Sequence, residues 1–216
     1  MNKRDAEALL RQGIELYDLG RYQEAIVMFD RALALFPDLS KAYYFKGIAL
    51  YDLGKYEDAI DAYDHAVAIE PLDTNAWYNK AATLAQMGKN KEAIEACDHL
   101  LTIKWDNAEA WILKGIAFYE LGRYKDAIGA YDHALTVDPR HAKVYYNKGI
   151  ALSNLKHYED AVSSYLTALG IDDQNRNGLK KLMPRLINSS GRSRDMLIYG
   201  QSKEFHSSES EDMMRL

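Results

Sequence analysis

The stretch SKAYYFKGIALYDLGKYEDAIDAYDHAVAIEP, residues 40–71, decides the fold. Its apolar and small residues recur at steps of three and four through Tyr43 and Gly47, stop at Gly54, and resume from Ala59 onward. This spacing predicts helices with one apolar face. Gly54 suits a helix C-terminus because it tolerates the left-handed backbone, and Pro71 lacks the amide that another helical turn needs. The stretch therefore predicts two short helices joined by a turn.

The same pattern returns every 34 residues in rows that begin at Ala6, Ser40, Thr74, Ala108 and Ala142. Each row keeps an aromatic or large apolar residue, a small residue and a run of packing residues at fixed positions, and the first four rows keep a turn glycine. The clearest columns are Leu9, Tyr43, Trp77, Trp111, Tyr145; Gly13, Gly47, Ala81, Gly115, Gly149; Gly20, Gly54, Gly88, Gly122, Lys156; and Phe29, Tyr63, Cys97, Tyr131, Tyr165. Self-similarity at such a period indicates a stacked repeat architecture, because one unit cannot bury its apolar face alone.

These columns resemble the tetratricopeptide repeat, whose signature is W-x2-L-G-x2-Y, then A-x3-F, then P over 34 residues. The resemblance covers residues 6–175. The departures are lysine before the small residue at Lys46, Lys80, Lys114 and Lys148, and a fifth row without its turn glycine and proline. We expect the lysine stems to lie on the helix pair with the ammonium groups in water.

The resemblance implies an all-α fold, a right-handed α-solenoid of antiparallel helix pairs. We expect a lead-in at residues 1–5 and five repeats at 6–39, 40–73, 74–107, 108–141 and 142–175. Residues 176–187 then form a capping helix over the last repeat. The serine-rich and charged segment 188–216 lacks sustained periodicity and is predicted to be a flexible tail.

Composition limits the classes of partner. Of the 216 residues 27% are charged, and the formal net charge is -5, which argues against nucleic acid or an anionic membrane as the main partner. No apolar run reaches the length that spans a bilayer. Cys97 is the only cysteine, which excludes an internal disulfide and suits a reducing compartment. We therefore expect a cytoplasmic protein.

The histidines at His65, His99 and His133 stand 34 residues apart, each directly after an aspartate. Arg31 and Thr167 fill the same column, which indicates a solvent-facing surface and not a coordination sphere. Neighbouring residues on a helix do not face each other, so the Asp-His pairs are not catalytic dyads. The sequence also lacks phosphate-loop and hydrolase motifs. We expect no enzyme activity, no cofactor and no metal site.

In the family that the sequence resembles, the first helices of successive repeats line a concave groove that binds peptides or partner proteins. That resemblance assigns to the groove a mainly apolar and aromatic set with two amides and two lysines: Tyr44, Ile48, Tyr51, Tyr78, Asn79, Ile112, Ile116, Tyr119, Tyr146, Asn147, Lys41 and Lys143. An exposed apolar surface of this kind is typical of an interaction site. The alternative is that the superhelix buries part of these rings as internal packing.

The predicted function is a non-catalytic scaffold that binds a peptide or partner protein in this groove. One alternative is a structural module that assembles through its repeat ends, although a monomer or weak self-association is expected. Another is a cochaperone for acidic chaperone tails, which Tyr44, Phe45 and Ile48 at the places of the family's basic clamp disfavour. A third is that the tail segment DMLIYG, residues 195–200, occupies the groove.

Overall fold

The computed structural model describes residues 3–171, and within them all regular structure is helical. The ten helices of this part are α1 (Lys3–Asp18), α2 (Tyr22–Leu35), α3 (Ser40–Asp52), α4 (Tyr56–Ile69), α5 (Thr74–Gln86), α6 (Asn90–Ile103), α7 (Ala108–Glu120), α8 (Tyr124–Val137), α9 (Ala142–Asn154) and α10 (Tyr158–Ile171). The chain forms two compact units, Met1–Asp138 and Pro139–Leu216, so α1–α8 belong to the first unit and α9 and α10 to the second.

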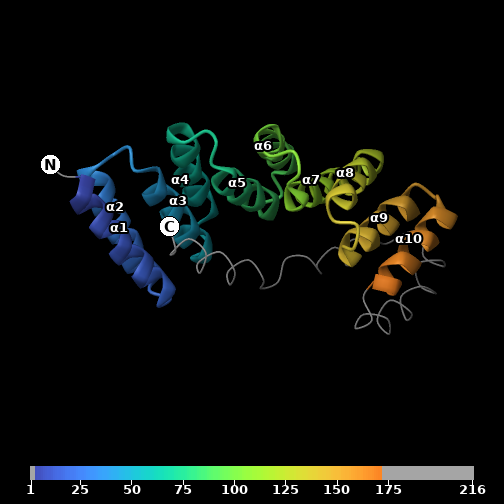
Figure 1. Ribbon diagram of the computed structural model, residues 1–216, viewed down its shortest axis with the longest axis horizontal. Helices are drawn as coiled ribbons and strands as arrows, with labels where there is room; N and C mark the ends of the chain where they lie inside the picture. The colour runs from blue at the N-terminus through green and yellow to red at the C-terminus, as the bar shows by residue number, and fades with distance from the viewer. Residues whose placement is uncertain (1–2, 172–216) are drawn as a thin grey trace. The chain divides into compact units, whose positions relative to one another are not determined.

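Within the first unit each helix packs mainly on its neighbours in sequence, and in the second unit α9 packs on α10 (Figure 1). The strongest contacts join the two helices of a pair, such as α1 with α2 or α3 with α4, and the next strongest join the second helix of one pair to the first helix of the next. This stepwise packing within the first unit is that of an α-solenoid, in which each helix pair buries its apolar face on the adjacent pairs. The all-α solenoid predicted from the sequence is confirmed.

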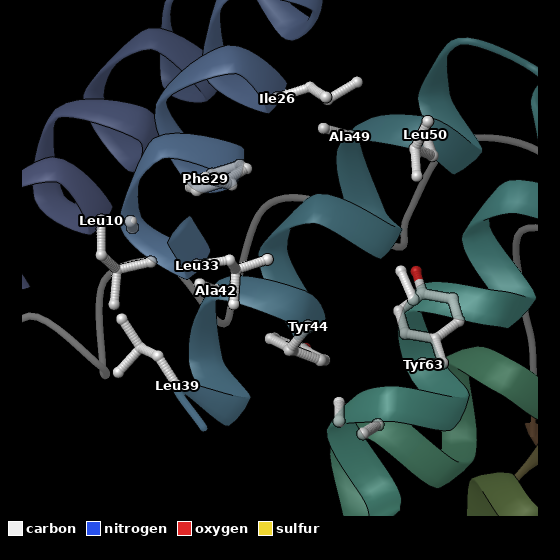
Figure 2. Packing of buried hydrophobic residues seen from close by; sticks show 14 of the residues in the cluster. Leu10, Ile26, Phe29, Leu33, Leu39, Ala42, Tyr44, Ala49, Leu50 and Tyr63 are labelled. Carbon is white, nitrogen blue, oxygen red and sulfur yellow. The ribbon is translucent and has the colours of Figure 1, made fainter. Parts of the chain in front are cut away.

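The core of the first unit runs continuously from pair to pair. Figure 2 shows Phe29 and Leu33 of α2 in the same cluster as Ala42 of α3, with Tyr44 and Tyr63 further along. Phe29 and Ala42 have no exposed surface. Small residues let the helices approach, and burial of each large side chain contributes about 1.5–3 kcal/mol relative to exposure. The packing columns of the sequence are therefore buried columns of the fold.

The turn inside each pair has a left-handed residue. Gly54 has φ 72°, and its amide donates to the carbonyl of Tyr51 at 2.8 Å, while the Lys55 amide donates to Leu50 at 2.9 Å. These bonds satisfy carbonyls at the end of α3. In the second unit Lys156 holds the same position with φ 63°, so the turn forms there without glycine. In the fifth row lysine replaces the turn glycine, and the left-handed conformation of the turn is kept.

Several predicted boundaries lie partly or wholly outside this description. Helix α1 begins at Lys3, inside the segment predicted as a lead-in. The negative charge of Asp5 in its first turn stabilises the helix by interacting with the positive end of the helix dipole. The capping helix at 176–187 and the tail at 188–216, including DMLIYG, lie outside the described residues. The division into five repeats with those limits stays a prediction.

Within residues 3–171, no helix combines the length and apolar character needed to cross a bilayer.

Candidate binding surface on the first helices

One side of the first unit is lined by the first helix of each pair. Helix α1 contacts α3, α3 contacts α5, and α5 contacts α7, whereas no two of the second helices α2, α4, α6 and α8 pack together to the same extent. Elements that approach more closely lie on the inside of a curve, so the first helices form a concave face. We use "concave face" for that surface of the first helices in the first unit. The family resemblance assigns to it Ile48, Tyr51, Tyr78, Ala82, Ala85, Ile112 and Ile116.

Most predicted groove residues of the first unit keep part of their surface open. Six of them are half-buried, so each contacts neighbouring side chains and also solvent. They are Ile48, Tyr51, Tyr78, Asn79, Ile112 and Ile116. Lys41 is exposed at the start of α3. These predicted groove positions are therefore partly accessible, and most of them are apolar or aromatic.

Two of the predicted groove tyrosines are packed inside. Tyr44 is 5% exposed and Tyr119 is 7% exposed. The Tyr44 hydroxyl accepts a hydrogen bond of 3.2 Å from the Asn79 side-chain amide, which belongs to the next first helix. Asn79, considered from sequence as a partner for a ligand backbone, thus already bonds the preceding repeat. For Tyr44 and Tyr119 the structure shows the internal packing that the sequence left as an alternative.

Tyrosines also join neighbouring helices near the C-terminal ends of α1 and α3. The Tyr17 hydroxyl donates to the Asp52 carboxylate at 2.7 Å, linking α1 to the end of α3. Burial raises the pKa of Tyr17, and the bond to Asp52 raises it further, so the phenol stays protonated. The Tyr51 ring packs on the Tyr56 ring at 5.3 Å between centroids. These contacts fix the orientation of the rings that border the face.

The remaining predicted site residues lie in the second unit. There, Lys143 is exposed on α9, and Tyr146 and Asn147 are half-buried. The Tyr146 ring packs on Tyr165 of α10 with centroids 5.7 Å apart. The structure therefore places these three residues on one helix of their own unit, and their participation in a shared site remains a prediction.

A second set of contacts recurs where the sequence predicted only solvated side chains. Lys46 pairs with Asp30 at 2.6 Å, Lys114 pairs with Asp98 at 2.5 Å, and Lys80 pairs with Asp64. Each pair joins the first helix of one repeat to the second helix of the repeat before it. These ammonium groups, expected only to reach water, also pair with the partly exposed aspartate of the preceding repeat. The signal was in the sequence as a fixed spacing of opposite charges.

The exposed histidines stack on the aromatic column of their own repeats. Ring centroids are 4.8 Å apart for Tyr43 and His65, 4.6 Å for Trp77 and His99, and 4.3 Å for Trp111 and His133. The solvent-facing placement predicted for the histidines is confirmed by their exposure. The stacking was not predicted, and it gives the repeated Asp-His pair a structural role: aspartate joins repeats and histidine covers an aromatic ring.

A metal ion and a reactive thiol each need a particular arrangement of side chains around them. Among the described residues, no three His, Cys, Asp or Glu side chains stand close enough to hold a metal ion. Cys97 is fully buried, and this burial raises the pKa of its thiol to about 12. A thiol of that pKa is protonated at neutral pH and unsuited to nucleophilic attack.

The outer side of the first helix pair is polar. At the α1 positions equivalent to Phe45, Lys46 and Ala49 of α3, the chain carries Arg11, Gln12 and Glu15, all exposed. The α3 residues face α2, whereas the α1 residues face solvent. A charged surface of this kind disfavours stacking on an apolar repeat end.

The arrangement defines the chain as an α-solenoid repeat protein with an accessible concave face. The family model for the tetratricopeptide repeat matches residues 10–74, 47–108 and 112–176. The chain belongs to the tetratricopeptide repeat family. No curated protein sequence matches it.

Several solved structures share the fold. MamA is 21% identical with a TM-score of 0.73 and covers 76% of this chain and 96% of its own. A MamA fragment, residues 41 to the end, from Desulfovibrio magneticus RS-1 is also 21% identical with a TM-score of 0.73, covering 79% and 96%. YrrB, described as a TPR protein with an unusual peptide-binding site, is 21% identical with a TM-score of 0.73, covering 84% and 94%. At this identity the likeness concerns the fold.

Proposed function

We propose that this protein is a non-catalytic scaffold that binds an extended peptide, or a peptide-like segment of a partner protein, on the concave face. The observation that carries the proposal is the incomplete burial of Ile48, Tyr51 and Ile116 on helices that approach one another. The helix-pair motif does not require large apolar residues at these positions. Exposed apolar residues collected on a concave surface are typical of an interaction site.

Two further considerations support a peptide as the ligand. An extended segment can contact several repeats at once, and it can place alternate side chains against successive first helices. The structural neighbour YrrB is described as having a peptide-binding site, although that statement concerns YrrB alone. The predicted residues Asn79 and Tyr44 serve the scaffold by fixing neighbouring repeats, while Ile48, Tyr51, Tyr78, Ile112 and Ile116 supply contact area.

Location and the alternatives are part of the same proposal. A cytoplasmic location is proposed from the composition and from the single cysteine. Assembly through repeat ends is the less favoured alternative, because Arg11, Gln12 and Glu15 cover the outer side of α1. A role with acidic chaperone tails is disfavoured, because aromatic and aliphatic side chains stand where the basic clamp is expected.

The test is selection of random peptides displayed on phage against the full chain, followed by binding measurements with the enriched peptides. The double variant Ile48→Asp, Ile116→Asp places two charges on the concave face and should weaken binding about tenfold or more. The control is Val27→Asp, which makes the same kind of change at a residue that is 47% exposed on the second helix α2. The control should bind as the wild type does.

Helical circular dichroism and thermal unfolding must show that the variants remain folded. Equal loss in the concave variant and in the control would contradict the proposal, and so would the absence of any enriched peptide.

A further inference from the structure

The charges of the first unit are sorted between faces. On the first helices, Lys46, Lys80 and Lys114 pair with aspartates of the preceding second helices, so their positive charge is used away from the concave face. In the column of Tyr17, Tyr51, Ala85 and Tyr119, the following residue is acidic in three of the four repeats of this unit, at Asp18, Asp52 and Glu120, with Gln86 in the other. We call Asp18, Asp52 and Glu120 the acidic edge.

The acidic edge borders the apolar lining directly. Asp52 follows Tyr51 in sequence, and the hydrogen bond from Tyr17 to Asp52 shows that the carboxylate lies beside the ring column of the neighbouring repeat. Asp18 and Glu120 are exposed. Near the start of these helices the charges are mixed, because Glu7 and Glu109 share a column with Lys41. Three residues beyond the acidic edge the chain carries Arg21, Lys55 and Arg123, and two of these, Arg21 and Arg123, pair with Glu24 and Asp126 of the following helices. The acidic edge therefore leaves negative charge beside the apolar positions.

The apolar lining changes size at the third repeat. The columns that carry Ile48 and Ile116 in the flanking repeats carry Ala82 on α5, and the column of Tyr51 and Tyr119 carries Ala85. Both alanines keep intermediate exposure, so other side chains do not fully cover them. At these two positions the side chains on α5 are therefore shorter than those on α3 and α7, although Tyr78 on the same helix is long. We expect these two positions to leave more room for a ligand side chain than Ile48 and Ile116 leave in the flanking repeats.

We propose that the partner of the concave face is a basic peptide segment with one bulky apolar side chain seated over Ala82 and Ala85 and lysine or arginine beside the acidic edge. This inference rests on the proposed function and specifies the ligand. The apolar side chain removes Ile48, Tyr51 and Ile116 from water as it binds. The cationic side chain meets Asp52 and Glu120, where complementary charge speeds association and selects the sequence of the ligand.

The same phage library tests this chemistry. Peptides enriched on the wild-type chain should share an aromatic or large aliphatic residue with lysine or arginine a few positions away, and their binding should weaken as salt increases. Enriched peptides that are acidic, or that share no large apolar residue, would overturn the inference.

Two variants test the two parts of the inference. Ala85→Tyr restores the residue of Tyr51 and Tyr119 in its column and should weaken the enriched peptides about tenfold, while Ala68→Tyr, an exposed site on the second helix α4, should not. Glu120→Gln should weaken binding about threefold and reduce its salt dependence, whereas Glu95→Gln on α6 should do neither. Tyrosine is native to this column in the neighbouring repeats, so Ala85→Tyr is expected to fold, which its melting curve checks.

The outcomes separate the inference from the proposed function. If Ile48→Asp, Ile116→Asp abolishes binding while Ala85→Tyr leaves it unchanged, the peptide binds the concave face but the seat over α5 is wrong. If Glu120→Gln has no effect at any salt concentration, the acidic edge does not select the ligand and the inference fails. If none of the concave-face variants changes binding, the proposed function fails as well.

Discussion

Gly47 lies directly against the ring of Tyr63, so that a Cβ atom at Gly47 would stand 2.5 Å from Tyr63 Cε1. The same contact recurs between Gly13 and Phe29, Gly115 and Tyr131, and Gly149 and Tyr165. In the third repeat both partners change: Ala81 stands at the glycine position and Cys97 at the aromatic one. A larger residue on one helix is thus matched by a smaller residue on the other, which is how close packing constrains two positions together.

Gly47→Ala should therefore destabilise the first unit. The added methyl group overlaps the Tyr63 ring, which is fully enclosed by its neighbours and has little freedom to move. We expect a loss of about 1–3 kcal/mol in the free energy of unfolding, measured by urea denaturation. In an unconstrained helix interior the same substitution would stabilise, so the sign of the effect reports the contact.

Gly129→Ala is the matched control, because no heavy atom within 4 Å would meet its Cβ in helix α8. It should stabilise by about 0.5–1 kcal/mol. Combining Gly47→Ala with Tyr63→Cys copies the third repeat, and the double variant should lose less than the two single changes added together. Simple additivity would show that Gly47 and Tyr63 do not constrain each other.

The sequence predicted what lies inside one repeat better than what joins two repeats. Gly47, Tyr63 and the turn at Gly54 belong to a single 34-residue unit, so their relationship is readable as a spacing. Tyr44 and Tyr78 share a column, yet Tyr44 is buried and Tyr78 only half-buried. The exposure of each depends on the neighbouring repeat, and that neighbour differs from one position to the next.

The charge pairs also show that contacts between repeats are hard to predict from the sequence. Lys46 and Asp30 stand in different repeats, and their 2.6 Å contact depends on how the two helix pairs stack. The spacing was visible in the sequence and it recurs at Lys114 and Asp98. What the sequence lacked was the stacking geometry, which decides whether a lysine meets water or an aspartate.

Tyr131→Phe should stabilise the protein or leave its stability unchanged. The Tyr131 hydroxyl is buried with no hydrogen-bond partner in the described part of the chain, and burial raises the pKa of the phenol. Removing an unsatisfied buried hydroxyl avoids a desolvation cost of about 1–3 kcal/mol. The same column carries phenylalanine at Phe29, so the ring alone suits the site. Thermal unfolding monitored by circular dichroism measures the change.

Tyr165→Phe is the comparison, since the Tyr165 hydroxyl lies 3.3 Å from Ser153 Oγ and shares a hydrogen bond with it. Its removal should destabilise by about 1 kcal/mol. A clear loss of stability in Tyr131→Phe would mean that the hydroxyl has a partner in solution.

Lys156→Gly should stabilise the turn between α9 and α10. Among the described residues that are not glycine, Lys156 is the one with a positive φ angle, which is 63°. A side chain in this conformation costs about 1–2 kcal/mol, and glycine removes that strain while adding entropy to the unfolded chain. We expect a net gain of about 0.5–1 kcal/mol in chemical denaturation. The reverse change, Gly122→Lys at φ 71°, should cost a similar amount, and two changes of equal sign would contradict the argument.

Cys97 should resist modification while the protein is folded. The side chain has no exposed surface, and burial raises the pKa of its thiol to about 12, with neighbouring Asp98 adding to the shift and Lys114 opposing it. Near neutral pH the thiolate is therefore scarce, and a disulfide reagent such as DTNB has no path to the sulfur. We expect very slow labelling of the native chain and complete labelling in denaturant.

A Cys97→Ala, Glu95→Cys variant supplies the control, because it places one cysteine at an exposed position on the same helix α6. That thiol should react readily in the folded protein. If native Cys97 reacts as fast as the control, α6 must open locally without global unfolding, since the native packing encloses the sulfur. Such opening would involve α6, which packs on α5, the helix that carries Ala82 and Ala85. Cys97 stands in a core column that carries tyrosine in the neighbouring repeats. Its smaller side chain would then be one reason why the concave face can adapt its shape at this repeat.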